Sequence, residues 1–202
     1  MKRFQLSFLC GLLAPFVYLL FTVLAYLRYP SPYSPTSNWL SDLGNPEVNP
    51  LGALFYNTGI VLTALLLMGF FAGLAAWKVE DKRPQVIMLR LTQVSGIAGA
   101  FRMLMSGFFP INSFSIHSFW STSLYILLST SFVFSAAMLR YRPEVPRWLL
   151  GLGILTAVVV ITTSFLQSLY VLEWITVLLF LCFVTILGIE TKRHTFRVVP
   201  TN

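Results

Sequence analysis

The sequence predicts an all-α fold: a polytopic integral membrane protein whose six transmembrane helices form one bundle, with both termini in the cytoplasm. Hydrophobic residues make up 56% of the 202 residues and charged residues only 10%, against about 25% charged residues in soluble domains. The mean hydropathy is +0.76. Phenylalanine occurs 18 times, and Gly and Pro lie inside the apolar runs, as is common in membrane-spanning helices. A soluble core could not bury this much apolar surface.

Six apolar runs are each long enough for a helix that crosses a bilayer, which takes about 20 residues. They cover residues about 5–27, 51–77, 86–109, 119–139, 148–169 and 172–190. The last two runs form one nearly uncharged stretch, which we divide where Gln167 and Glu173 lie close together. The connections are too short to hold a soluble domain, so residues 1–202 are predicted to form a single transmembrane domain.

The distribution of Lys and Arg predicts how the helices are oriented in the cell membrane. Most basic residues fall on one side of the six spans: Lys2, Arg3, Lys78, Lys82, Arg83, Arg90, Arg140, Arg142, Arg147, Lys192, Arg193 and Arg197. Because cytoplasmic loops are enriched in Lys and Arg, we expect loops 28–50 and 110–118, with the turn near 168–173, to be extracytoplasmic. The net charge of +7 is then mostly an orientation signal, and nucleic acid is not an expected partner.

Arg102 is the charged residue that most needs explaining, because it lies about 10 Å from the outer end of its helix at about 1.5 Å per residue. It shares a small, polar helical face with Ser95, Gly99 and Ser106, which predicts that this face looks into the bundle. The alternative is that Arg102 extends outward to lipid phosphates. Asn57 lies at the same depth in the second span and could hydrogen-bond Arg102, or simply join two helices.

His117 opens the fourth span on the predicted outer side, and Ser121 follows one turn deeper on the same face. A histidine at this place is either an interfacial or capping residue or part of a site. The other histidine, His194, lies on the predicted cytoplasmic side. The two rings cannot meet, which argues against bis-histidine haem and against a three-histidine zinc site.

The stretch SNWLSDLGNP, residues 37–46, is the densest polar segment between two apolar runs. Ser41 and Asp42 could cap a short helix, or Asp42 could reach down to pair with Arg102 or His117. Seven polar residues fall in the outer half of the bundle, whereas the inner half has no comparable set. This asymmetry predicts a cavity that opens outward, lined by Asp42, Asn57, Arg102, His117, Ser121, Gln167 and Glu173.

Two stretches resemble the signature regions of a family of membrane proteins catalogued as domain of unknown function 998. They are YSPTSNWLSDLGNP with the following LFYNTGI, and GFFPINSFSIHSFWSTSLY. The matching features are the Ser41–Asp42 pair before the second span, the Gly-x-Phe-Pro turn at 107–110, and His117. The resemblance implies a six-helix prokaryotic or archaeal membrane protein and no particular reaction. A fainter similarity to proteins that remodel lipid on GPI anchors raises the expectation of lipid chemistry only by analogy.

Three functions compete. An enzyme of the outer leaflet would act on a lipid or lipid-linked anionic substrate. Its general base would be His117, oriented by Asp42, and its nucleophile Ser41 or Ser121. In a binding protein or transporter the headgroup, or a small anionic ligand, would lie on Arg102, Asn57, Gln167 and Glu173. An accessory subunit would use the same groups to hold helices together. No cofactor is expected, and Asp42, His117 and Glu173 are a thin ligand set for a metal. The oligomeric state stays open.

Overall fold

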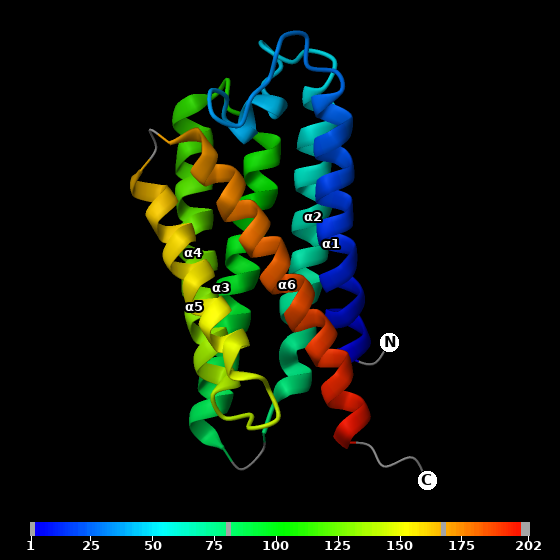
Figure 1. Ribbon diagram of the computed structural model, residues 1–202, viewed down its shortest axis with the longest axis vertical. Helices are drawn as coiled ribbons and strands as arrows, with labels where there is room; N and C mark the ends of the chain where they lie inside the picture. The colour runs from blue at the N-terminus through cyan, green and yellow to red at the C-terminus, as the bar shows by residue number, and fades with distance from the viewer. Residues whose placement is uncertain (1–2, 80–81, 167–168, 199–202) are drawn as a thin grey trace.

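The computed structural model describes residues 3–79, 82–166 and 169–198, which form six long α-helices joined by short connections. Figure 1 shows them as one elongated bundle. The helices are α1 (Arg3–Tyr26), α2 (Ala53–Gly73), α3 (Arg83–Phe108), α4 (Phe114–Leu139), α5 (Arg147–Phe165) and α6 (Tyr170–Val198). Two short 3₁₀ helices accompany them, η1 (Leu40–Gly44) and η2 (Leu74–Trp77), and η2 continues α2. The predicted all-α bundle is confirmed.

Five of the helices are long and apolar enough to cross a membrane: α1, α2 with η2, α4, α5 and α6. The remaining one, α3, has a comparable length of 26 residues but carries Arg83, Arg90 and Arg102. Large apolar side chains such as Phe16, Leu54 and Phe165 point outward with 62–78% of their surface exposed. A surface of this kind fits hydrocarbon surroundings better than water.

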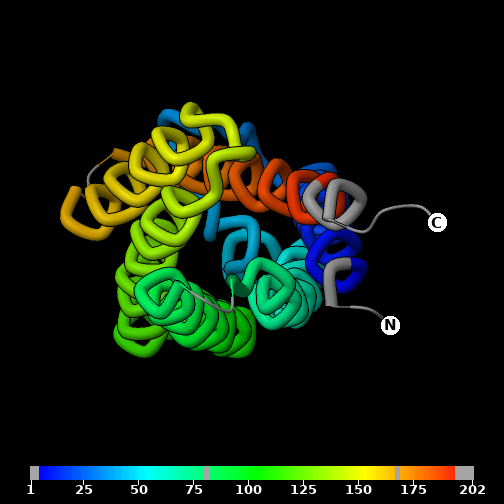
Figure 2. The backbone as a smooth tube through the Cα atoms, turned by 90° about the horizontal axis from the view of Figure 1, so that it is seen from below, coloured from blue at the N-terminus to red at the C-terminus, as the bar shows by residue number. Residues whose placement is uncertain are grey.

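The helices close into a ring, seen end-on in Figure 2. Each helix packs against the next one along the chain, and α6 returns to pack against α1. At that closure a Cβ atom on Gly11 would lie 3.2 Å from the Cα of Gly188, so the two backbones touch. Small residues at such crossings let membrane helices approach closely.

The two ends of the bundle differ. The connection between α1 and α2 lies across one end, here called the loop end, together with the short α3–α4 connection (Figure 1). Within this connection η1 packs against α1, α2 and α6. Helix α1 begins and α6 ends at the opposite end. The loop end is therefore covered by the segment that contains the polar stretch 37–46.

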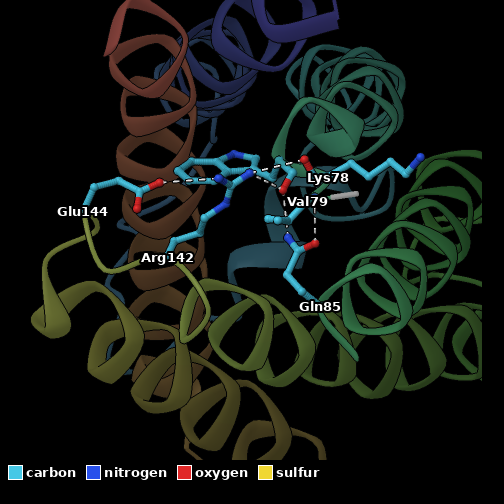
Figure 3. A network of polar contacts seen from close by, with 6 residues as sticks. Lys78, Val79, Gln85, Arg142 and Glu144 are labelled. Carbon is cyan, nitrogen blue, oxygen red and sulfur yellow. Dashed lines mark hydrogen bonds and ion pairs between the residues drawn. The ribbon is translucent and has the colours of Figure 1, made fainter. Parts of the chain in front are cut away.

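A polar network holds the connections together at the opposite end (Figure 3). The carbonyl oxygen of Trp77 accepts hydrogen bonds from Arg142 Nη2 at 2.6 Å and from Gln85 Nε2 at 2.8 Å. Glu144 pairs with Arg142 at 3.6 Å, and the backbone N–H of Val79 donates to Gln85 Oε1. These contacts satisfy carbonyl and amide groups that the end of η2 would leave unpaired. They join the α2–α3 connection to the α4–α5 connection.

Helix α4 begins at Phe114 rather than near residue 119, so His117 lies inside its first turn. The carbonyl oxygen of Ser113 accepts the N–H groups of Ile116 and His117, which starts the helix before the polar pair His117–Ser118. Helix α6 continues beyond residue 190 to Val198, and Arg193 pairs with Glu190 at 2.7 Å in this extension. Because α4 begins at Phe114, the loop predicted at 110–118 is shorter than expected.

Candidate functional site

The ring of helices encloses a hollow near the loop end. It consists of two adjoining cavities, with volumes of about 70 Å³ and about 290 Å³. Both are lined by Ser41, Ile111, His117, Ser121, Tyr125 and Glu173. These residues come from η1, the α3–α4 connection, α4 and α6, so the hollow exists only because the ring closes.

The hollow is polar where the two cavities meet and apolar further into the bundle. Five of the described residues that line the smaller cavity are aliphatic or aromatic hydrocarbons drawn from α4, α5 and α6: Leu124, Leu128, Val160, Val177 and Phe180. In the larger cavity, Ser164 Oγ is buried without a hydrogen-bond partner among the described residues. An amphipathic hollow of this kind can hold a molecule with one polar and one apolar end.

Two carboxylates hold the η1 turn over the hollow. Asp42 Oδ2 accepts the backbone N–H of Trp39 at 2.9 Å, three residues before it. Glu173 Oε2 on α6 accepts the N–H of Leu40 at 2.7 Å and that of Ser41 at 3.4 Å. The first N–H groups of a helical turn have no partner within the turn, and here two carboxylates satisfy them.

Two asparagines fix the same segment to the ends of α1 and α2. Asn49 is fully buried, and its Nδ2 donates to the carbonyl oxygens of Ala25 at 3.2 Å and Leu43 at 2.8 Å. Asn57 Nδ2 on α2 donates to the carbonyl oxygen of Gly44 at 2.9 Å. The segment is thus a packed cover with satisfied polar groups rather than a loose connection.

His117 lines both cavities. Its Nδ1 lies 2.8 Å from the carbonyl oxygen of Phe109, and because a carbonyl can only accept, Nδ1 carries the proton. In the neutral ring Nε2 is then the basic nitrogen. Ser121 Oγ donates to the carbonyl oxygen of His117 at 2.9 Å, so its proton is held by its own helix.

Arg102 lies away from the hollow, over two aromatic rings. Its guanidinium carbon lies over the rings of Trp120 at 4.7 Å and Phe119 at 5.3 Å, and Arg102 lines neither cavity. The predicted hydrogen bond to Asn57 is replaced by the bond from Asn57 to Gly44. A guanidinium over aromatic faces is stabilised by cation–π attraction, and no ion pair recorded for the described residues includes Arg102.

The other predicted residues divide into two groups. Ser41, Asn57, His117, Ser121 and Glu173 meet at the hollow. Asp42 lines neither cavity and acts as the cap that the sequence offered as its alternative role. Burial raises the pKa of the Asp42 carboxyl, and the bond from the Trp39 N–H opposes this change. Gln167 lies outside the described residues.

Three tyrosines at the hollow were not predicted as site residues. Tyr18 on α1 and Tyr56 on α2 place their hydroxyl oxygens 3.1 Å apart, and Tyr125 on α4 lines both cavities. Tyrosine was counted as part of an apolar run, so these three residues could not be distinguished from the rest of their predicted spans. Their signal would have been the hydroxyl group itself, which seeks a partner when it is buried.

Replacing Asp42 tests the cap. We expect Asp42→Ala to lower the free energy of unfolding by about 1 kcal/mol, because the Trp39 N–H loses its acceptor. Asp42→Asn keeps an acceptor oxygen and should restore most of this loss. Thermal unfolding in detergent, followed by circular dichroism, measures both variants. Equal destabilisation by Ala and Asn would show that the charge of Asp42, rather than its hydrogen bond, stabilises the segment.

Within the described part of the chain, no three His, Cys, Asp or Glu side chains are grouped in a way that could hold a metal ion.

Comparison with known proteins gives one family. Neither the curated proteins nor the solved structures give a match to this chain. A family model described as "Protein of unknown function (DUF998)" matches residues 12–190. Because this match covers most of the chain, the protein belongs to the DUF998 family.

Proposed function

We propose that the protein binds a lipid or a lipid-linked molecule in the hollow of the helix ring. The polar head would lie among His117, Ser121, Tyr125 and Glu173, and the hydrocarbon chain would follow the apolar wall. The observation that carries this proposal is the change from polar to apolar lining within one hollow. Such a gradient matches the shape of a lipid, whereas a water-soluble ligand would gain nothing from the apolar part.

The orientation proposed from the sequence assigns the hollow to one leaflet of the membrane. Lys78, Arg142 and Arg147 lie in or next to the connections at the opposite end of the bundle. Under the positive-inside rule this end is cytoplasmic and the loop end extracytoplasmic. We therefore propose that the lipid enters from the outer leaflet of the cell membrane, beneath the η1 cover.

A chemical step on the bound lipid is supported by the tautomer of His117. With Nδ1 held by the Phe109 carbonyl, the Nε2 atom can accept a proton from a hydroxyl group or water in the hollow. Ser41 and Ser121 are the serines that line both cavities. The hydroxyl proton of Ser121 already goes to its own helix, so its Oγ would have to rotate to serve as a nucleophile.

A pair of serines on α4 tests the binding proposal. Ser121 and Ser123 each donate to the carbonyl four residues earlier, at 2.9 Å and 2.7 Å, but only Ser121 lines the hollow. We expect Ser121→Phe to reduce the lipid that copurifies with the protein about tenfold, because the ring occupies the hollow and a tenfold change needs only about 1.4 kcal/mol. Native mass spectrometry after mild delipidation measures the occupancy.

Ser123→Phe is the matched control, since it removes the same hydrogen bond outside the hollow. Its occupancy should equal that of the unchanged protein. A similar lipid content in all three proteins would contradict the proposal, and loss of a partner subunit with unchanged lipid would favour the accessory role. His117→Gln separates lipid binding from a chemical step on the lipid. If the variant still binds lipid but no longer converts it, whereas the unchanged protein does, then His117 takes part in the reaction. If both proteins bind lipid and neither converts it, the protein only binds lipid.

A further inference from the structure

Glu173 accepts hydrogen bonds from the cover and also faces the hollow. The backbone N–H groups of Leu40 and Ser41 both donate to its Oε2, and the Ser41 side chain adds a hydrogen bond to the carboxylate, whereas the residue lines both cavities. Of the ion pairs recorded for the described residues, none includes Glu173. An ionisable group inside a membrane-spanning helix is costly unless it is paired, so the carboxylate raises the question of its ionic partner.

Its surroundings favour a positive partner. Tyr18, Tyr56 and Tyr125 line the smaller cavity together with Glu173. Electron-rich ring faces attract cations. Among the described residues that line the two cavities there is no Lys or Arg, and the one titratable base beside Glu173 in both linings is His117.

The local backbone explains how the Glu173 carboxylate is tolerated at this place. It lies in the first turn of α6, where the helix dipole favours a negative group, and two N–H groups of the cover neutralise part of its charge. Both N–H groups donate to Oε2 and so orient the carboxylate. Among the described residues, no backbone N–H is recorded on Oε1.

We propose that the hollow recognises a lipid whose headgroup carries a cationic ammonium group, which Glu173 binds through Oε1 with the faces of Tyr18, Tyr56 and Tyr125 around it. This deepens the proposed function and rests on it. The sign is opposite to that predicted from the sequence, where Arg102 was expected to hold an anionic head. Arg102 itself lies over Phe119 and Trp120 and lines neither cavity.

The test compares two lipids with the same chains and different heads. Delipidated full-length protein in detergent is given an equimolar mixture of dioleoyl phosphatidylethanolamine, which has an ammonium group, and dioleoyl phosphatidylglycerol, which has none. Native mass spectrometry then measures the ratio of the two bound lipids. We expect the unchanged protein to favour the ethanolamine lipid about tenfold, as one charge-assisted hydrogen bond allows.

Glu173→Gln removes the charge and keeps an acceptor for Leu40 and Ser41, and we expect it to bring the ratio close to one. The matched control is Glu47→Gln, which makes the same charge change at an exposed position of the loop and should leave the preference intact. Thermal unfolding in detergent checks that both variants are folded.

Three results would overturn the inference. They are an unchanged protein that shows no preference, a preference for the glycerol lipid, or a preference that survives Glu173→Gln. Each of these leaves the proposed function standing as long as lipid is bound and Ser121→Phe displaces it. Binding of neither lipid to the unchanged protein would overturn the proposed function, and this inference with it.

Discussion

Gly59→Ala is expected to destabilise the protein by about 2 kcal/mol, within the usual range for an overpacked core. A Cβ atom at this position would lie 2.4 Å from the Cβ of Phe21 on α1. Because Phe21 Cβ is fixed to its own backbone, no side-chain rotation relieves the clash, and α1 and α2 must move apart. The gain in helix propensity, about 1 kcal/mol at most, offsets only part of this loss.

Gly151→Ala is the matched control for this substitution. It lies in α5, and a Cβ there meets no atom within 4 Å. Its free energy of unfolding should stay the same or rise by up to about 1 kcal/mol. Unfolding in a titration of sodium dodecyl sulfate, followed by circular dichroism, compares the two variants. Equal stability of both would mean that the α1–α2 contact can relax without loss.

The Gly59 substitution should also weaken lipid binding. Tyr56 lies one turn before Gly59 on α2, and its hydroxyl oxygen is 3.1 Å from that of Tyr18 on α1. Separation of the two helices pulls these hydroxyl groups apart, and both line the hollow. We therefore expect stability and lipid occupancy to fall together, whereas Ser121→Phe lowers occupancy with little effect on stability.

The positions of the helices could be predicted from the sequence because the bilayer sets the length of an apolar run. Depth along the bundle was predictable for the same reason. Asn57, His117, Ser121 and Glu173 were placed in the outer half of the bundle by topology alone, and they do meet at the hollow. What depth cannot supply is the rotation of each helix about its own axis.

Arg102 shows how this missing rotation misleads. Its neighbour Met103 lines the hollow, whereas Arg102, turned by about 100° on the same helix, lies over Trp120. Ser95, Gly99 and Ser106 of the face around Arg102 are buried, as predicted, yet only Ser106 among them lines a cavity. Aromatic partners on a neighbouring helix leave no periodic pattern that could have predicted this arrangement.

Asp42 was misplaced for a different reason. Its local acceptor role needs only the N–H of Trp39, three residues away, so little chain entropy is lost in forming the bond. A long-range pair with Arg102 or His117 would have to order two distant segments for one contact. The carboxylate that does reach across the hollow is Glu173, whose helix already holds it in place.

Asn49→Asp is expected to destabilise the cover by about 2–4 kcal/mol, the largest effect predicted for this segment. Asn49 Nδ2 donates to the carbonyl oxygens of Ala25 and Leu43, and Oδ1 accepts the N–H of Gly52 at 3.1 Å. The substitution keeps the size and the acceptor but replaces the donor by a carboxylate oxygen. Two carbonyl oxygens then face a negative charge in a fully buried place.

Asn45→Asp is the control on the same segment. The Oδ1 atom of Asn45 accepts the N–H of Glu47 at 3.0 Å in an exposed turn, and a carboxylate makes this bond equally well. Its stability should stay within about 0.5 kcal/mol of the unchanged protein. Hydrogen exchange of residues 37–50 distinguishes the two variants, because only Asn49→Asp should open the cover. Equal protection in both would mean that Asn49 fills space without holding the segment.

The pH dependence of Asn49→Asp follows from the same geometry. A protonated carboxyl at this position regains one donor and loses its charge, so the deficit should shrink as the pH falls. Asn45→Asp should show no such recovery, because its carboxylate is already well placed. If opening of the cover also releases bound lipid, and acid restores both together, then the stretch 37–46 is the lid of the hollow rather than a connection between two helices.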